Sequence, residues 1–254
     1  FDEIPPASGQ ALRRELQREA AGSIDYALLD LTQEEYESYY LGFANRALWP
    51  LFHFRLDAMQ FERQQYAMYR AVNRLFAQHL APLLDDDSTI WIHDYHLIPL
   101  AAELRALGVK SRIGFFLHVP VPPGDLLARL PCHADLFAAL FSYDVVGVHT
   151  EGYAAALRDY LQRFLGASLV ADSAELAGRS TRVAAFPISI DAMETARTAE
   201  KAVDTRAVHE LLAAQDNRKL VIGVDRLDYS KGLPLRFAAF GSFLDQNPSW
   251  HAGV

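Results

Sequence analysis

The feature that most constrains the fold is an alternation of strand-like and helix-like segments between residues 89 and 190. Short runs rich in β-branched and aromatic residues cover Thr89–His93, Arg112–His118, Asp144–His149 and Arg182–Ile190. Between these runs apolar residues recur at helical spacing, and two of the helical stretches stop at Gly108 and Gly166. Strands that alternate with helices predict an α/β protein with a parallel sheet and helices on both faces.

Upstream of this alternation, residues 24–29 have the composition of a further strand. Thr32 and Glu35 then fit a capping box, in which the Thr32 side chain caps a helix and the Glu35 side chain reaches back, so a helix is expected to follow. Apolar residues at helical spacing between Phe61 and Leu84 predict a long helix.

A change of pattern marks a second domain. Residues 191–217 are rich in Ala, Thr and charge, and are expected to be helical over Val208–Ala214. Lys219–Val224 then reads as a buried strand, followed by a helix from Gly232 to about Asp245. We therefore expect one domain at residues 1–190, a linker at 191–217, and the start of a second domain at 218–254.

Composition excludes several functional classes. With 24 Lys and Arg against 32 Asp and Glu the formal net charge is −8, which disfavours a binder of nucleic acid that relies on a broad basic surface. Cys132 is the single cysteine, so an internal disulfide and a cysteine-rich metal site are excluded and a reducing compartment is expected. The sequence contains no apolar run of 18 residues, so no membrane span is predicted. Because the sequence starts without Met and stops just past a helical pattern, we expect it to be an internal part of a longer protein.

Polar residues follow four of the predicted strands. They are His93-Asp94, His118, His149-Thr150 and Asp225-Arg226. Ligands of open parallel sheets bind beyond the carboxyl ends of the strands, so this recurrence predicts a polar cleft. Asp94 could accept hydrogen bonds from substrate hydroxyls or simply cap a loop, and His118 could contact a ligand or belong to the core.

His93 and His96 stand three residues apart and could be read as metal ligands. No third ligand has an obvious position nearby, and the pair begins at the end of a strand. We therefore prefer packed, hydrogen-bonded histidines and predict no metal site.

The segment Val224–Pro234 has the features of an anion site. A strand would run into Arg226, and Ser230 is expected to cap a helix that opens with Lys231-Gly232 and carries Pro234 in its first turn. A guanidinium, an ammonium and a helix N-terminus around one point would suit a diphosphate. The alternative is a surface salt bridge with Asp225 or Asp228.

Aromatic residues are dense before residue 50. Tyr36, Tyr39, Tyr40 and Phe43 precede Trp49-Pro50. Such side chains could pack a helix against the sheet, or stack on the apolar faces of a sugar.

Four motifs together resemble a known family. They are Tyr39-Tyr40…Asn45-Arg-Ala-Leu-Trp-Pro50, Trp91-Ile-His-Asp-Tyr-His-Leu97, Arg112-Ile-Gly-Phe-Phe-Leu-His-Val-Pro120 and Asp225-Arg-Leu-Asp-Tyr-Ser-Lys-Gly232. In this order they resemble the trehalose-6-phosphate synthases, over residues 24 to 254. The resemblance implies the GT-B fold, two facing Rossmann-like domains, of which the second would be incomplete here.

The resemblance also implies roles for particular residues. Tyr40, Trp49 and Asp94 would bind the acceptor glucose 6-phosphate, and Trp49 and Val119 would lie near the position that sets anomer selectivity. His118 would contact the donor glucose. Arg226 and Lys231 would hold the diphosphate of UDP-glucose or a related donor and stabilise the leaving group. His118, Asp94, Arg226 and Lys231 would form the catalytic set of a retaining, cytoplasmic hexosyltransferase of trehalose biosynthesis.

Several points stay open under this resemblance. The glycine-rich loop that supplies an arginine to the acceptor phosphate would precede Phe1, and the acidic loop that holds the ribose would follow Val254. We therefore expect these 254 residues alone to be inactive, and the acceptor and the donor base stay open. Glucosylglycerol-phosphate synthases, pseudo-glycosyltransferases and non-catalytic regulatory relatives are the alternatives. No cofactor beyond the nucleotide-sugar substrate is expected, nor a nucleic-acid or membrane partner, and a homo-oligomer is left open.

Overall fold

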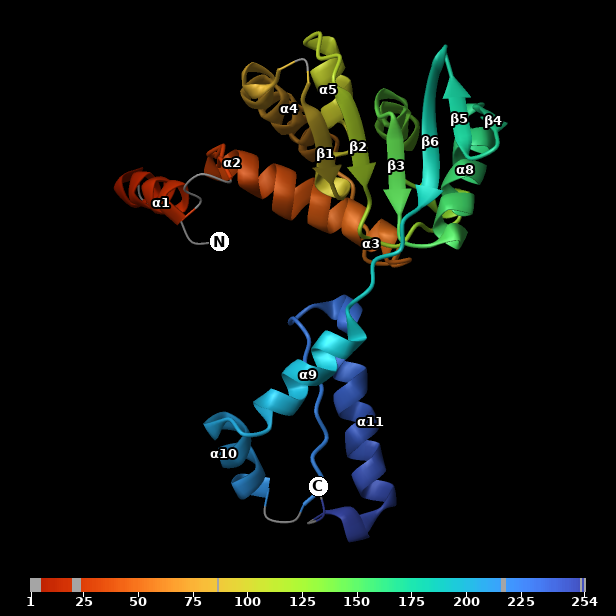
Figure 1. The fold of residues 1–254 in the computed structure, drawn as a ribbon. Coiled ribbons are helices and arrows are strands. Elements are labelled where there is room, and N and C mark those ends of the chain that lie inside the picture. Colours follow the sequence, from red (N-terminus) through yellow and green to blue (C-terminus); the bar gives the residue numbers. More distant parts are fainter. Residues whose placement is uncertain (1–5, 20–23, 86, 216–217, 252, 254) are drawn as a thin grey trace. The chain divides into compact units, whose positions relative to one another are not determined.

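The chain forms two compact units, Phe1–Pro187 and Ile188–Val254. The computed structural model describes residues 6–19, 24–85, 87–215, 218–251 and 253 of the chain (Figure 1). All residues of the main hydrophobic core belong to the first unit, between Tyr39 and Val183.

The first unit is built on one six-stranded sheet of order β1-β2-β3-β6-β5-β4. Its strands are β1 (Thr89–His93), β2 (Arg112–Phe116), β3 (Val145–Val148), β4 (Ser168–Val170), β5 (Ser173–Leu176) and β6 (Arg179–Ala185). Strands β1, β2, β3 and β6 are parallel, and β5 and β4 extend the sheet antiparallel to β6. The sequence predicts all four parallel strands, which point the same way in Figure 1. The limits of the last are wrong, since β6 begins three residues before the predicted Arg182 and ends at Ala185, and residues 186–190 are not strand.

Helices and helical turns connect and flank these strands. In the first unit they are α1 (Pro6–Glu19), α2 (Gln33–Tyr36), the π-helix η1 (Glu37–Leu48), α3 (Trp49–Phe52), α4 (Arg63–Leu80), η2 (Ala81–Leu83), η3 (Tyr95–Leu97), α5 (Leu100–Ala106), α6 (Gly124–Leu127), α7 (His133–Ala138), η4 (Ala139–Ser142) and α8 (Glu151–Leu165). The Thr32 capping box is present as predicted. Helix α8 ends at Gly166, whose φ of 74° lies in the left-handed region that glycine adopts without strain.

Alternation along the parallel strands places the core on one face of the sheet. Ile90, Ile92, Ile113 and Phe115 are buried with residues of α4, α5 and α8. On the other face of β1, Trp91 is 67% exposed. Register pairs Trp91 with Gly114 and His93 with Phe116, so the carboxyl ends of β1 and β2 lie at the same edge.

Two parts of the first unit differ from the sequence prediction. Residues 24–29 are not a strand, because in the described chain no neighbouring strand offers them hydrogen bonds. The β4–β5 pair, in contrast, is missing from the prediction. Its strands are three and four residues long and β4 is largely exposed, so they carry little hydrophobic pattern.

The second unit contains helices and a long extended segment. Its helical elements are α9 (Ala192–Ala202), α10 (Arg206–Gln215), η5 (Tyr229–Lys231), α11 (Leu233–Gln246) and η6 (Pro248–Trp250). Helix α10 contains the predicted helical residues Val208–Ala214, and α11 matches the helix predicted from Gly232.

The predicted strand Lys219–Val224 is wrong for this structure. The segment has no strand pairing, and Ile222 and Val224 are 74% and 84% exposed. An apolar run becomes a strand only where another strand completes its hydrogen bonds, and the described part of the second unit contains no other strand.

Candidate functional site

The carboxyl ends of β1 and β2 bring two predicted site residues together. Asp94 directly follows β1, and His118 lies two residues after β2. The backbone N–H of His118 donates to Oδ1 of Asp94 at 3.3 Å, and the N–H of Asp94 donates to the Phe116 carbonyl at 2.8 Å. His149, after β3, lies edge-on to His118 with ring centroids 5.8 Å apart. Three of the four predicted polar strand ends therefore lie at one edge of the sheet in the first unit, and the polar cleft stays a prediction.

Asp94 adopts a backbone conformation that favours glycine. Its φ of 72° and ψ of 166° lie in a region where a side chain costs about 1–3 kcal/mol. Oδ1 of the same residue accepts hydrogen bonds from the N–H groups of both Tyr95 and His118. The surrounding structure thus holds a strained backbone and a fixed carboxylate at the candidate site, which is where such strain is typically found.

Tyr40 and Trp49 come from a distorted helical region. Tyr40 lies in η1, a π-helix of 12 residues, and Trp49 follows directly as the first residue of α3. At the end of η1, the N–H of Trp49 donates to the carbonyl of Ala44, which is the five-residue spacing of a π-helix. Winding of this kind is frequently found at functional sites, and the sequence pattern does not distinguish it from an α-helix.

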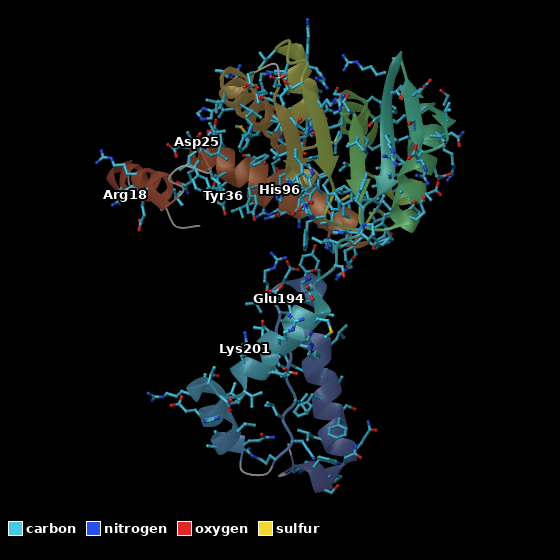
Figure 2. The ribbon with its side chains drawn as sticks, viewed as in Figure 1. Arg18, Asp25, Tyr36, His96, Glu194 and Lys201 are labelled. Atoms are coloured by element: carbon cyan, nitrogen blue, oxygen red, sulfur yellow. The ribbon has the colours of Figure 1, made fainter. Side chains whose placement is uncertain are left out.

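His96 links these two aromatic residues. The Tyr40 ring stacks on His96 with centroids 5.2 Å apart and planes at 14°, and Tyr95 packs against His96 at 4.0 Å. Tyr95 in turn contacts Trp49 at 5.9 Å. Tyr36 extends the series, since its ring stacks on Tyr40 with centroids 5.4 Å apart. Figure 2 labels both Tyr36 and His96. The aromatic residues therefore form one continuous series beside Asp94.

The environment of His96 favours its neutral form. Burial lowers its pKa, opposed by the nearby Asp94 carboxylate. Within the described residues, Nε2 of His96 is buried and lacks a hydrogen-bond partner, as does Nε1 of Trp49. Sequence reasoning considered His96 only as a metal ligand or a packed histidine. Its contact with Tyr40 requires the fold, because 56 residues separate the two.

Neither histidine of the His93–His96 pair belongs to a metal cluster. His93 bonds His118, and His96 stacks on Tyr40. In the part of the chain that the structure describes, no group of three or more His, Cys, Asp or Glu side chains is placed to hold a metal ion.

Val119 lies directly after His118 and is 5% exposed. The side chain belongs to the hydrophobic core of the first unit. Its part in anomer selectivity stays a prediction.

The second unit carries Arg226 and Lys231, both exposed. The predicted salt-bridge alternative is not formed: Asp225 pairs with Arg236 at 2.6 Å, and Oδ1 of Asp228 accepts from the N–H of Ser230. Among the described residues, neither Arg226 nor Lys231 forms an ion pair.

The helix start near Lys231 differs from the prediction. Asp228, not Ser230, caps the short turn η5, and Gly232 with a φ of 63° precedes α11. Pro234 occupies the first turn of α11 as predicted. Ser230 cannot cap α11 because it lies inside η5, three residues before the helix begins.

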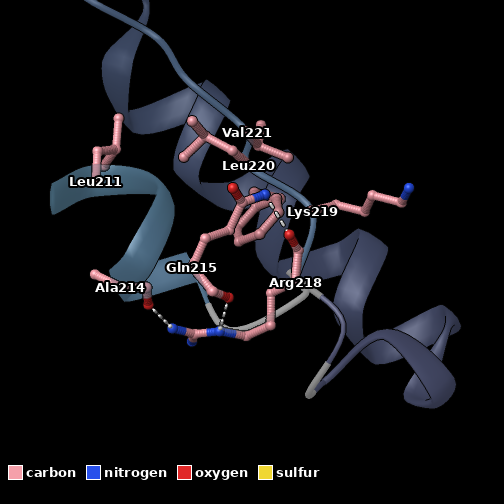
Figure 3. Close-up of a pocket in the computed structure, with 8 residues that line it drawn as sticks. Leu211, Ala214, Gln215, Arg218, Lys219, Leu220 and Val221 are labelled. Atoms are coloured by element: carbon pink, nitrogen blue, oxygen red, sulfur yellow. Dashed lines mark hydrogen bonds between the residues drawn. The ribbon is translucent and has the colours of Figure 1, made fainter. Parts of the chain in front are cut away.

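A separate hollow of about 270 Å³ lies in the second unit (Figure 3). It is lined by Leu211, Ala214, Gln215, Arg218, Lys219, Leu220, Val221 and Phe240. The Arg218 guanidinium donates to the carbonyls of Gln215 and Ala214 and so caps the end of α10. None of the predicted site residues is among the eight that line it, so this hollow is not the predicted anion site.

None of the helices in the described part of the chain combines the length and the apolarity that a membrane span requires.

Comparison with known proteins places the fold and the motifs in one family. The chain is 46% identical over 237 residues to the trehalose-6-phosphate synthase of Sinorhizobium fredii, which covers 92% of this chain and 50% of the relative. It is 40% identical over 240 residues to the trehalose-6-phosphate synthase of Citrobacter koseri, and this match covers 94% of this chain and 50% of the relative. The chain thus spans about half the length of the curated relatives it matches.

Solved structures agree with the sequence comparison. A crystal structure of an α,α-trehalose-phosphate synthase (UDP-forming) from Burkholderia xenovorans in complex with glucose-6-phosphate matches with a TM-score of 0.84 and 42% identity, covering 88% of this chain and 50% of that one. The α,α-trehalose-6-phosphate synthase of Burkholderia multivorans matches with a TM-score of 0.83 and 45% identity, covering 88% and 49%. The predicted GT-B type of α/β fold is therefore confirmed. Together with a match to the family description over residues 3–254, these likenesses show that the chain belongs to glycosyltransferase family 20.

Proposed function

We propose that the full-length protein containing this chain transfers glucose from a nucleotide-glucose, UDP-glucose first among the candidates, to glucose 6-phosphate with retention, which gives trehalose 6-phosphate. The observation that carries the proposal is the carboxylate of Asp94, a residue with a strained backbone. Its Oδ1 accepts from the His118 N–H, and it adjoins the aromatic series that includes Tyr40 and Trp49. The name of the Burkholderia xenovorans relative, a UDP-forming synthase in complex with glucose-6-phosphate, supports this choice of substrates.

The acceptor is assigned to the first unit. Tyr40 and Trp49 offer aromatic faces to the apolar faces of a sugar, and Asp94 accepts hydrogen bonds from its hydroxyls. Because Oδ1 of Asp94 already accepts two backbone N–H groups, Oδ2 is the oxygen assigned to the acceptor. His118 contacts the donor glucose.

The donor diphosphate is assigned to Arg226 and Lys231. The two cations stabilise the negative charge that develops on the leaving phosphate as the glycosidic bond breaks. With no carboxylate nucleophile assigned, the acceptor hydroxyl attacks the face that the phosphate leaves and gives its proton to that phosphate.

Product analysis of the full-length protein tests the proposal. UDP-, GDP- and ADP-glucose are each combined with glucose 6-phosphate or with glycerol 3-phosphate, and the products are separated by mass and anomeric configuration. We expect trehalose 6-phosphate from glucose 6-phosphate, with α configuration at the transferred glucose. A product only with glycerol 3-phosphate, or no product with any pair, would contradict the assignment.

A further inference from the structure

Two histidines at the ends of neighbouring strands share a hydrogen bond that the proposed mechanism does not yet use. Nδ1 of His93, the last residue of β1, lies 2.9 Å from Nε2 of His118, which follows β2. The ring centroids are 5.2 Å apart with planes at 22°. The distance between the ring centroids equals the N···N distance plus the radius of each ring, so both centroids and both nitrogens lie close to one line. The two imidazoles therefore meet edge to edge and nearly in one plane. This geometry aligns the two nitrogens for a hydrogen bond.

Aromatic neighbours hold both rings in this arrangement. Trp91, two residues before His93 on the same face of β1, packs against His93 at 4.4 Å. Phe116, two residues before His118, packs against His118 at 4.7 Å. Each imidazole is thus held by an aromatic side chain from its own strand, and the bond between them joins the ends of β1 and β2.

An N···N hydrogen bond between imidazoles contains one hydrogen, so it couples the protonation of the two rings. If His93 donates from Nδ1, neutral His118 carries its single N–H hydrogen on Nδ1. If neutral His118 donates from Nε2 instead, its Nδ1 carries no hydrogen. The pair carries at most one positive charge while the bond persists. Partial burial and the neighbouring His118 lower the pKa of His93, and the Asp94 carboxylate opposes this shift in part. Among the described residues, His149 also lies beside the pair, edge-on to His118.

We propose that His93 is a positioning residue for His118: through the Nδ1···Nε2 bond it fixes the His118 ring and selects the tautomer that His118 presents at Nδ1. The inference rests on the proposed function, in which His118 contacts the donor glucose. Its consequence is that Nδ1 of His118 meets the sugar in one defined state, either as a donor or as an acceptor. His93 itself then touches neither substrate.

Ring-nitrogen NMR of the 254-residue chain tests the coupling without any catalysis. Two-bond 1H–15N spectra report the tautomer of each histidine, and His118 is identified by its absence in a His118→Gln sample. We expect the two His118 nitrogens to have well-separated shifts, as in a single tautomer. In His93→Leu these shifts should move towards each other, because the ring then samples both tautomers.

Matched variants separate the bond from simple packing. The amide of Asn lies close to the position of a histidine Nδ1, so His93→Asn should retain the separated His118 shifts. The amide of Gln reaches the position of Nε2 instead, so His93→Gln should behave as His93→Leu does. His149→Asn should leave the separation unchanged. Backbone amide spectra show that each variant is folded, which the exposure of His93 favours. Unchanged His118 shifts in both His93→Leu and His93→Gln would overturn the proposal.

Kinetics in the full-length protein provide the second readout. His93→Leu should lower kcat by roughly tenfold to a hundredfold, as loss of a positioned ring does, with the KM for glucose 6-phosphate unchanged. His93→Asn should restore most of kcat. If the proposed function is wrong, neither the unaltered protein nor any variant transfers glucose, but the His118 shifts still respond to the His93 variants as described. If only the inference is wrong, His93→Leu transfers glucose at the rate of the unaltered protein.

Discussion

At the scale of single residues, backbone strain and burial concentrate beside the candidate site. Asp94 has a conformation that favours glycine, and its carboxylate accepts two backbone N–H groups at the end of β1. His96 keeps a half-buried imidazole against Tyr40, and its buried Nε2 has no hydrogen-bond partner among the described residues. Both arrangements oppose stability locally and fix the direction of a side chain, which is typical of ligand-binding sites.

Asp94 gives a test of backbone strain. At an ordinary loop position Ala is at least as stabilising as Gly, since Gly loses more chain entropy on folding. At position 94 the order should reverse. Both substitutions remove the carboxylate, but only Gly relaxes a φ of 72°, so Asp94→Gly should be about 1 kcal/mol more stable than Asp94→Ala. Urea unfolding of the two variants measures the difference, and an Ala variant as stable as the Gly variant would contradict the strain.

His96 gives a test at acidic pH. Burial holds the pKa of His96 below the ordinary 6.5, so the folded chain binds fewer protons than the unfolded chain as pH falls below that value. Its contribution to stability is complete above pH 6.5 and declines as the pH falls towards the folded pKa. Burial is also the chief cause that lowers the pKa of His93 and that of His133.

Replacing His96 by Phe retains a ring against Tyr40 and removes the titration. Comparing urea midpoints at pH 7.5 and pH 5.5, we expect His96→Phe to lose less stability than the unaltered chain over this interval. An equal loss in both proteins would show that His96 is not held neutral.

At the scale of elements, the parallel strands were predictable and the irregular elements were not. The limits of β1 agree with the sequence pattern residue for residue, because Thr89–His93 has strong β propensity and ends at a polar turn. The π-wound η1, the hairpin β4–β5 and the contact of Tyr40 with His96 depend on tertiary packing, which local periodicity does not encode. For residues 24–29 and Lys219–Val224 the sequence predicts strands that the structure does not contain. Strand propensity alone does not produce a strand where no partner strand is present.

Gly147 tests how closely the side chains pack above β3. A Cβ at this position would lie 2.9 Å from Phe116 and 3.0 Å from Phe186. Gly147→Ala should therefore destabilise the chain by about 1–3 kcal/mol and displace Phe116, which packs against His118.

Gly114 in β2 is the matched control for this prediction. A Cβ there would lie 3.4 Å from Val145, an ordinary contact, so Gly114→Ala should change stability by less than about 1 kcal/mol. Thermal unfolding of both variants gives the comparison. A Gly147→Ala variant as stable as Gly114→Ala would show that Phe116 and Phe186 are free to move aside.

At the scale of the whole molecule, the first unit is a packed domain. In the second unit the apolar segment Lys219–Val224 is exposed. Asp94, His118, Tyr40 and Trp49 lie in the first unit, and Arg226 and Lys231 lie in the second. These residues were predicted chiefly from the resemblance of four motifs to a known family, because each motif stays contiguous in sequence. The long-range contacts within the first unit, such as that of Asp94 with His118, were not accessible in this way, since they arise only from the sheet order and the winding of η1.

The 254-residue chain should release no UDP from UDP-glucose in the presence of glucose 6-phosphate. The reason is that Lys219–Val224, which leads into Arg226, carries no strand pairing here, so the proposed donor site would lack a fixed framework. A coupled assay of UDP release measures this, with the full-length protein as the positive control. Turnover by the chain at a rate near that of the full-length protein would contradict the expectation.

We propose above that Arg226 stabilises the leaving diphosphate during transfer to glucose 6-phosphate. The most direct measurement is 13C NMR of the product that the full-length protein and its Arg226→Ala variant form from UDP-[1-13C]glucose. We expect α-configured trehalose 6-phosphate from the unaltered protein and a kcat lowered by roughly a hundredfold or more in the folded variant. An unchanged kcat in Arg226→Ala, or a β-configured product, would contradict it.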